Sequence, residues 1–163
     1  GIRVPMIVRG PGIKNDSRCN VNVVGYDFLP TFFELAGGEV EKLRGVDGVS
    51  IKPLFRGKKN PVFAKRYLHF HYPHHRNTAP HSVVLQGDLK YFRFYEQPGS
   101  HYLYNLKYSI GETENIAVQN KAAVARLAGE MDRYHAAVKA CVPKPNPDTD
   151  SGYKPFDPDK RWE

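Results

Sequence analysis

The chain has 163 residues, of which 40% are hydrophobic, 12% aromatic and 25% charged. This composition is typical of a globular protein and excludes disordered, collagen-like and coiled-coil chains. No apolar run approaches the roughly 20 residues that a membrane-spanning helix requires. The 24 lysines and arginines outnumber the 17 aspartates and glutamates, which leaves a net charge of +7.

The excess positive charge lies in the first two thirds of the chain. Residues 1–60 contain 10 basic and 6 acidic side chains, residues 61–109 contain 6 and 2, and residues 110–163 contain 8 and 9. The first two segments could attract an anionic ligand such as a nucleic acid, a phosphate or a sulfated molecule. A soluble surface rich in lysine explains the same charge. The sequence has no run of five or six like charges, which argues against a nucleic-acid-binding tail.

A strand and a helix are the first elements that the pattern predicts. Residues 3–9 read as a β-strand, which the Gly-Pro-Gly at residues 10–12 closes as a turn. Because the chain starts at Gly1 and enters this strand at once, we expect it to be cut from a longer protein. Asp27 is expected to be the N-cap of a helix over residues 28–36, which has Pro30 in its first turn.

Residues 39–65 read mostly as loop, and the next segment predicts an antiparallel sheet of about four strands. The expected strands are residues 66–72, 81–86, 89–95 and 102–106. Gly87 and Asp88 stand between two apolar runs, which is typical of a hairpin turn. A second helix is predicted over residues 120–138, and an extended tail rich in proline and aspartate follows it. The stripe that would pack on the sheet consists of Val124, Leu127, Ala128, Met131 and Tyr134.

A cluster of histidines is the most conspicuous chemical feature. It comprises His69, His71, His74 and His75, with Arg76 and His81 close by in sequence. On a strand His69 and His71 share one face, because side chains alternate. Three interpretations remain open: a zinc site, histidines satisfied by packing, or contacts to an anion or sugar from the 73–80 loop. Asp88 and Glu96 read as turn or solvent residues.

Other catalytic patterns are absent from the sequence. There is no phosphate-binding glycine loop and no Gly-x-Ser-x-Gly motif. Cys19 and Cys141 could form a disulfide or remain free thiols. Cys141-Val142-Pro143 is followed by Lys144 and Pro145.

Five segments of the chain carry recognisable motifs. They are GIRVPMIVRGPG, DFLPTFFELAG, DGVSIKPLFRG, GDLKY and LYNLKYSIGETENIA, at residues 1–12, 27–37, 47–57, 87–91 and 103–117. Together, and in this order, they resemble one family, the type I formylglycine-dependent sulfatases (arylsulfatases) of the alkaline-phosphatase-like superfamily. The resemblance covers residues 1–138 and implies an α+β fold. Residues 1–60 would be the last strand and helix of a large α/β domain. Residues 61–142 would form a small C-terminal subdomain with the sheet and one long packing helix, and residues 143–163 its tail.

The resemblance also implies which chemical groups the chain lacks. The family's nucleophile is a formylglycine made in a Cys/Ser-x-Pro/Ala-x-Arg motif, and a calcium ion assists it; both would lie upstream. The segment from Cys141 departs from that motif, since it has Lys144 and Pro145 where the motif has a small residue and arginine. We therefore assign no catalytic residue and no metal ligand here, and we expect the chain alone to be inactive.

What the chain would contribute by resemblance is scaffold and pocket rim. The 73–80 loop is the expected rim, with His74, His75 and Arg76 as contacts to a sulfated small molecule or glycan and His71 as second choice. The other expected partner is the missing N-terminal portion, with no nucleic acid and no membrane span. The family implies a periplasmic, secreted or lysosomal location. The alternatives are a non-catalytic polyanion-binding fragment and part of a related phosphodiesterase or phosphonate hydrolase.

Overall fold

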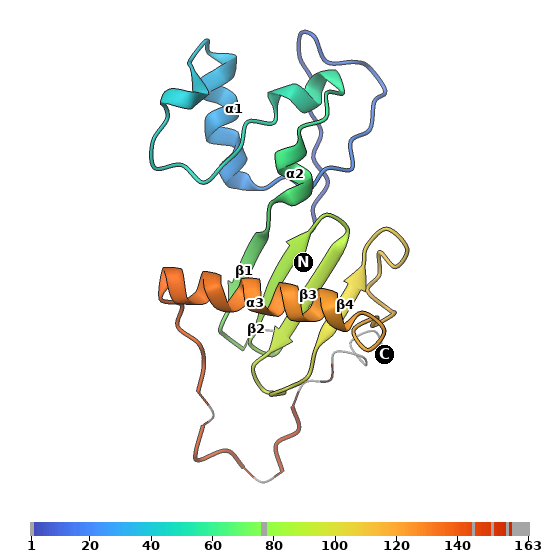
Figure 1. Cartoon of the computed structure of the whole chain (residues 1–163), viewed down its shortest axis with the longest axis vertical. Helices are drawn as coiled ribbons and strands as arrows, with labels where there is room; N and C mark the ends of the chain where they lie inside the picture. The colour runs from blue at the N-terminus through green and yellow to red at the C-terminus, as the bar shows by residue number, and fades with distance from the viewer. Residues whose placement is uncertain (1, 76–77, 145, 151, 156, 158–163) are drawn as a thin grey trace. The chain divides into compact units, whose positions relative to one another are not determined.

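The computed structural model describes residues 2–75, 78–144, 146–150, 152–155 and 157. The chain falls into two compact units, which divide between Lys65 and Arg66 (Figure 1). In chain order the elements are η1 (Gly25–Asp27), α1 (Phe28–Leu35), η2 (Val40–Lys42), η3 (Lys52–Arg56), α2 (Pro61–Lys65), β1 (Leu68–Tyr72), β2 (His81–Gln86), β3 (Leu89–Phe94), β4 (Tyr102–Asn105) and α3 (Lys121–Val138). This α+β content, with one antiparallel sheet and one long helix, confirms the predicted fold class.

The segment predicted as the first strand differs from the prediction. Residues 3–9 form no strand with any part of the chain that the structure describes. They are open to solvent, and Val4 and Ile7 are 78% and 94% exposed. A strand exists only when a neighbour pairs with its backbone N–H and C=O groups. The strand predicted at residues 3–9 is therefore not formed within the described chain. The resemblance assigns it to the sheet of a larger domain, whose other strands would lie outside these residues.

A buried carboxylate organises the first unit. Asp27 is fully buried, and its Oδ2 accepts a hydrogen bond from the N–H of Val24 at 2.9 Å. Its Oδ1 accepts another from the N–H of Val49 at 3.0 Å. Asp27 does occupy the N-cap position of α1, as predicted, but its side chain makes no capping hydrogen bond to that helix. It instead connects the turn before α1 to a loop 22 residues further along the chain.

The residues around Asp27 extend this connection. The hydroxyl of Thr31 donates to the Asp27 carbonyl at 2.6 Å and accepts from the N–H of Ile51 at 3.0 Å. Gly48 lies so close to the preceding turn that a Cβ atom there would stand 2.1 Å from the carbonyl oxygen of Tyr26. Only glycine allows this approach. The loop over residues 47–51 is therefore held against the start of α1 by specific polar contacts and by one missing side chain.

The second unit is built on a four-stranded antiparallel sheet with the strand order β1-β2-β3-β4. The β2 and β3 strands pair directly up to Gln86 and Leu89, so only two residues form the turn between them. Gly87, the first of the two, has a φ of +55°, and Asp88 has no positive φ. A glycine at the first central position is the pattern of a type II′ hairpin turn. The hairpin predicted at these residues is confirmed.

One face of the sheet is covered by α3, which lies across the strands (Figure 1). The strands supply Val84, Tyr91 and Leu103 to this interface, and all three are fully buried. The helix supplies Leu127 and Met131, which are also fully buried, and the rest of the cluster is Ala117 and Val124. The predicted helical stripe is confirmed, because Ala128 packs at the edge of this cluster and Tyr134 stacks on His69.

Truncation of Leu127 should destabilise the second unit strongly. Leu127→Ala removes a fully buried side chain from the middle of the interface between α3 and the sheet. We expect it to lower the free energy of unfolding by about 2–5 kcal/mol. Val138→Ala is the matched control, since Val138 is on the same helix and 52% exposed; its effect should stay within about 0.5 kcal/mol. If urea unfolding showed the same loss of free energy of unfolding for both variants, the described packing of Leu127 would be contradicted.

Candidate functional site

The histidine segment divides between a covered face and an exposed loop. His69 and His71 share the face of β1 that α3 covers, as their spacing predicted. The His69 ring stacks on Tyr134 with centroids 4.0 Å apart and an interplanar angle of 5°. Its Nε2 lies 3.4 Å from Oε1 of Glu130. Burial lowers the pKa of His69 below its ordinary value, although the Glu130 carboxylate acts in the opposite direction.

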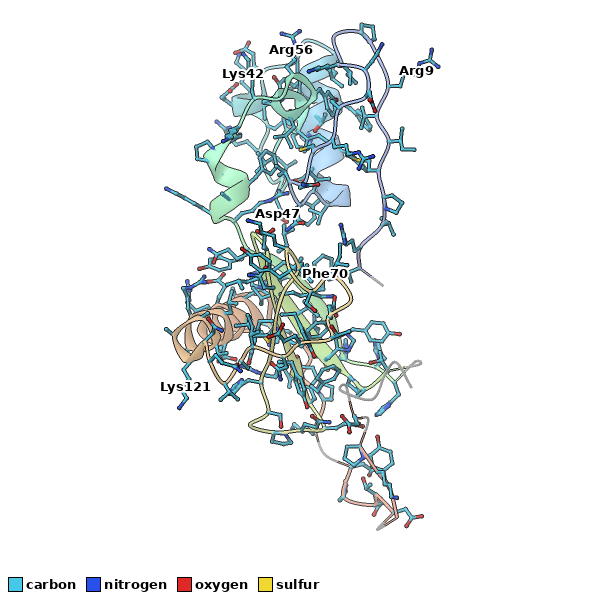
Figure 2. The ribbon with its side chains drawn as sticks, turned by 90° about the vertical axis from the view of Figure 1, so that its right-hand side faces the viewer. Arg9, Lys42, Asp47, Arg56, Phe70 and Lys121 are labelled. Atoms are coloured by element: carbon cyan, nitrogen blue, oxygen red, sulfur yellow. The ribbon has the colours of Figure 1, made fainter. Side chains whose placement is uncertain are left out.

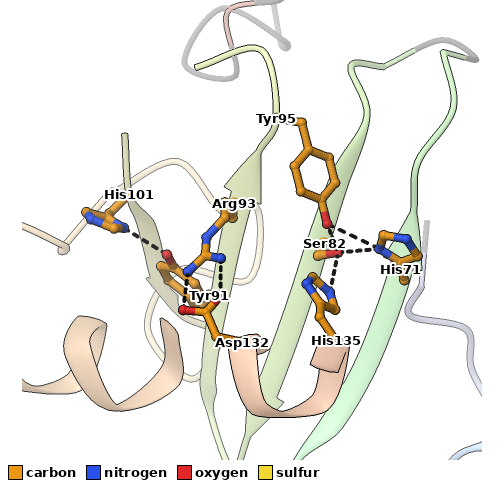
Figure 3. Close-up of polar contacts among 8 residues, drawn as sticks. All are labelled: His71, Ser82, Tyr91, Arg93, Tyr95, His101, Asp132 and His135. Carbon is orange, nitrogen blue, oxygen red and sulfur yellow. Dashed lines mark hydrogen bonds and ion pairs between the residues drawn. The ribbon is translucent and has the colours of Figure 1, made fainter. Parts of the chain in front are cut away.

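His71 has hydrogen-bond partners within the chain at both ring nitrogens. Its Nδ1 lies 2.7 Å from the Ser82 hydroxyl and 3.2 Å from the Tyr95 hydroxyl. Its Nε2 lies 3.0 Å from the carbonyl oxygen of Cys141. The hydroxyl of Ser82 also contacts the Tyr95 hydroxyl at 2.7 Å and Nε2 of His135 at 3.1 Å (Figure 3). The geometry therefore favours a packing and hydrogen-bonding role for His71.

A second polar group lies beside this network on the same face of the sheet. The Arg93 guanidinium donates to both carboxylate oxygens of Asp132 on α3, at 2.5 and 3.4 Å (Figure 3). The hydrogen bond from Arg93 holds the pKa of Asp132 below its ordinary value. The Tyr91 hydroxyl lies 2.8 Å from Nδ1 of His101, and burial raises the pKa of Tyr91. The ion pair between Arg93 and Asp132 joins β3 to α3, while the contact between Tyr91 and His101 lies within the sheet side of the interface.

The loop after β1 presents two exposed histidines. His74 is exposed, and its ring meets the ring of Tyr72 edge-on at a centroid distance of 5.8 Å. His75 has a side chain that is 60% exposed, and its Nε2 lies 2.6 Å from Oε1 of Glu96. Arg76, the third predicted contact, lies outside the described residues.

Glu96 anchors this loop. Its side chain is only 18% exposed, and its Oε1 also accepts a hydrogen bond from the hydroxyl of Tyr153 at 2.7 Å. The other oxygen, Oε2, is buried and has no hydrogen-bond partner among the described residues. Glu96 lies in the turn after β3, which is one of the two roles predicted for it, but its carboxylate is mostly buried because it contacts His75 and Tyr153.

Sequence reasoning also missed the polar residues under α3. Ser82, Tyr95 and His135 come from three different elements, and no local motif joins them. One signal was available, because Asp132 and His135 are three residues apart and so lie on one helix face next to Met131. That face is the one buried on the sheet, where polar residues require partners.

The remaining open alternatives can be compared with the geometry. Within the described residues, no group of three or more His, Cys, Asp or Glu side chains could hold a metal ion. Cys19 and Cys141 are free and exposed. No described helix combines the length and the apolar character needed to cross a membrane. Of the three interpretations of the histidine segment, packing fits His69 and His71, and ligand contact fits the exposed loop.

Basic side chains extend over the surface of the first unit. Arg9, Lys42 and Arg56 are exposed (Figure 2), and the Arg56 guanidinium lies next to Gly12, 3.8 Å from where a Cβ atom on that glycine would stand. Lys42 is paired with Glu39 at 2.6 Å. These exposed charges are compatible with both explanations of the positive excess, an anionic ligand and a soluble surface rich in lysine.

Comparison with known proteins places the chain in a family. The model of the C-terminal region of N-sulphoglucosamine sulphohydrolase matches residues 1–137. A sulfatase from Formosa agariphila is 32% identical over 130 residues, which cover 74% of this chain and 24% of that protein. An N-acetylglucosamine-6-O-sulfatase from Bacteroides thetaiotaomicron is 28% identical over 164 residues, or 98% of this chain and 27% of that protein. The chain thus spans about a quarter of the length of these relatives.

Solved structures agree with the sequence comparison. The structure of BT4656 in complex with its substrate D-glucosamine-2-N,6-O-disulfate superposes with a TM-score of 0.52 and 25% identity, over 69% of this chain and 24% of that one. The crystal structure of Ps i-CgsB gives a TM-score of 0.53 and 28% identity, over 66% and 23%. The sulfatase resemblance of the five sequence motifs is confirmed, and the chain belongs to the N-sulphoglucosamine sulphohydrolase C-terminal family.

Proposed function

We propose that the chain is the C-terminal part of a sulfatase, a sulfuric ester hydrolase that acts on a sulfated sugar. The family match over residues 1–137 is the observation that carries this proposal. A second observation supports it: this chain matches only about a quarter of the length of the related sulfatases, so the remaining three quarters of such a protein would come from other residues. The chain would contribute scaffold and part of the pocket rim.

The 73–80 loop is the proposed rim. His74 and His75 are exposed there, and loops at the ends of strands carry binding residues more often than the strands do. Since the Glu96 carboxylate accepts a hydrogen bond from Nε2 of His75, the imidazole is oriented and Nδ1 remains for a ligand. A protonated imidazole would donate from Nδ1 to a sulfate oxygen, and a neutral one would accept from a sugar hydroxyl. Arg76 would be a further donor to a sulfate. His71 is a weaker candidate because its ring nitrogens already contact Ser82 and Cys141.

The chemistry would come from the remainder of the parent protein. Sulfatases use calcium and a formylglycine, and the described residues do not fit that calcium site, since no group of three suitable ligands occurs among them. The chain accordingly has a supporting role in the proposal. By resemblance the parent would be periplasmic, secreted or lysosomal.

The first test concerns catalysis. The purified 163-residue chain should show no turnover of an aryl sulfate, because the proposal assigns the nucleophile and the metal to other residues. The full-length parent should hydrolyse the same compound and should prefer it strongly over the corresponding phosphate ester. Turnover by the isolated chain would refute the assigned role, and a preference for phosphate would favour the phosphodiesterase alternative.

The second test concerns the rim. In the parent, His75→Ala should raise KM for a sulfated glucosamine saccharide about tenfold, which corresponds to the loss of one charge-assisted hydrogen bond of about 1.4 kcal/mol. Glu96→Gln should raise KM less, because it loosens the orientation of His75 without removing the ring. His101→Ala is the control, since His101 is an exposed histidine outside the 73–80 loop. An unchanged KM for His75→Ala would exclude His75 from the rim.

The third test concerns the remainder of the parent as a partner. On α1, Leu29 and Phe32 are 58% and 63% exposed, and apolar side chains grouped in this way mark a contact surface. We expect Leu29→Glu with Phe32→Glu to raise the monomeric fraction of the isolated chain in light scattering and to lower the soluble yield of the parent. Lys42→Glu, an exposed charge change on η2, should do neither. A fully soluble parent with both substitutions would contradict this contact.

The positive surface favours one alternative, a non-catalytic fragment that binds polyanions. Residues 1–109 carry 16 of the basic and 8 of the acidic side chains, and Arg9 and Arg56 are exposed (Figure 2). Two results together would favour this alternative over the enzyme. The isolated chain would be retained on a heparin-like polymer in a salt-dependent way, and the parent sequence would lack the Cys/Ser-x-Pro/Ala-x-Arg motif.

A further inference from the structure

Four polar side chains meet where α3 ends on the sheet. His71 comes from β1, Ser82 from β2, Tyr95 from the residue after β3 and His135 from the last turn of α3 (Figure 3). Ser82 is 1% exposed and lies at the centre. Its hydroxyl is 2.7 Å from His71 Nδ1, 2.7 Å from the Tyr95 hydroxyl and 3.1 Å from His135 Nε2. The sulfatase chemistry does not use this cluster, and of its members only His71 is a candidate for the proposed rim, as the weaker choice.

The partners determine where the protons lie when both imidazoles are neutral. The Cys141 carbonyl can only accept, so Nε2 of His71 carries its proton and Nδ1 is an acceptor. Two hydroxyl groups contact Nδ1 of His71, that of Ser82 at 2.7 Å and that of Tyr95 at 3.2 Å. We assign the donated hydrogen bond to Ser82, because its contact is the shorter one. Ser82 accepts in turn from Tyr95 and from Nε2 of His135. This arrangement satisfies the three contacts of the Ser82 hydroxyl and the contact between His71 and Cys141 without a charge. The 3.2 Å contact between the Tyr95 hydroxyl and Nδ1 of His71 has no proton of its own in it.

The cluster also holds the chain that leaves α3. The helix ends with Lys139 in the left-handed region at a φ of +51°. The N–H of Ala140 donates to the His135 carbonyl at 2.9 Å, and the N–H of Lys139 donates to Ala136 at 3.3 Å, which is the pattern of a Schellman motif. Two residues beyond Lys139, the Cys141 carbonyl accepts from His71. The histidines therefore attach both the last turn of α3 and the segment after it to β1 and β2.

We propose that this cluster is an acid-sensitive latch, which holds the end of α3 and residues 139–141 against the sheet while His71 and His135 are neutral and releases them when the imidazoles are protonated. Protonated His71 has no acceptor nitrogen for the Ser82 hydroxyl. If both imidazoles were charged, two cations would face each other with ring centroids 5.0 Å apart.

The surrounding charges favour the neutral state. Burial lowers the pKa of His135, and the positive charges of His71 and Arg93 lower it further, while Asp132 acts in the opposite direction. The other ionisable groups of the packed elements are His69, Tyr91 and Tyr95 on the sheet and Glu130, Arg133 and Tyr134 on α3. Among these, His69 resembles His135, because burial also lowers its pKa and Glu130 opposes the shift.

The lowered pKa of His135 sets the sign of the pH effect on the latch. An imidazole whose pKa is lower in the folded state stabilises that state above the unfolded value of 6.5. This contribution is lost as the pH falls from 6.5 through the lowered folded value. Acidification from about pH 7.5 to about pH 5 therefore spans the change that the latch should undergo.

Hydrogen exchange of the 163-residue chain tests the latch locally. After correction for the intrinsic exchange rate, the amides of residues 139–142 should exchange about tenfold faster at about pH 5 than at about pH 7.5, the factor that corresponds to the loss of one hydrogen bond. In His135→Gln, which keeps a donor to Ser82 but cannot be protonated, most of this acceleration should disappear. His101→Gln is the matched control and should behave as the unmodified chain does, because His101 contacts Tyr91 outside the cluster.

A second variant separates the latch from general stability. Ser82→Ala removes the central hydroxyl and should give fast exchange at residues 139–142 at both pH values, with the amides around Leu103 in β4 still protected. Exchange in the unmodified chain that is independent of pH would overturn the proposal. So would an equally steep acceleration in His135→Gln, or fast exchange of the whole sheet together with residues 139–142.

Discussion

The packing of α3 across one face of a four-stranded antiparallel sheet is the constraint on which the second unit depends. The sheet has a single long helix to bury that face, and Leu127 and Met131 fill its centre against Tyr91 and Leu103. Each buried apolar side chain of this size contributes about 1.5–3 kcal/mol through removal from water. Since the apolar contacts occupy the middle of α3, the polar residues of the interface are concentrated towards its C-terminal end.

This division along α3 explains why one run of histidines has two roles. His69 and His71 alternate on β1 and so face the helix, where Tyr134 and His135 meet them. The strand ends at Tyr72, and the alternation ends with it. His74 and His75 therefore leave the covered face and become exposed. Burial makes partners compulsory for the first pair, whereas the second pair is exposed, which is why the proposed rim is assigned to His74 and His75.

Much of this fold was predictable because its signals are local. The stripe through Leu127 and the turn at Gly87 each follow from the spacing or type of neighbouring residues, and both are confirmed. The polar contacts were not predictable in the same way. Ser82 and His135 are 53 residues apart, and Glu96 reaches its partner Tyr153 across 57 residues. Such pairs depend on the register of the sheet and on the axial position of α3, which no single segment of sequence encodes.

The motifs that revealed the family act on the fold more than on the substrate. Asp27 is required as a buried acceptor for two backbone N–H groups, Thr31 as a donor and acceptor between α1 and the next loop, and Gly48 as the one residue small enough for that approach. A residue type that a backbone contact demands says little about which sugar is bound. Recognition of a particular sulfated sugar would therefore depend on exposed positions such as His74 and His75. The sequence features that identify the family most clearly are thus the least informative about substrate, and the loop after β1 is where members with different substrates should differ.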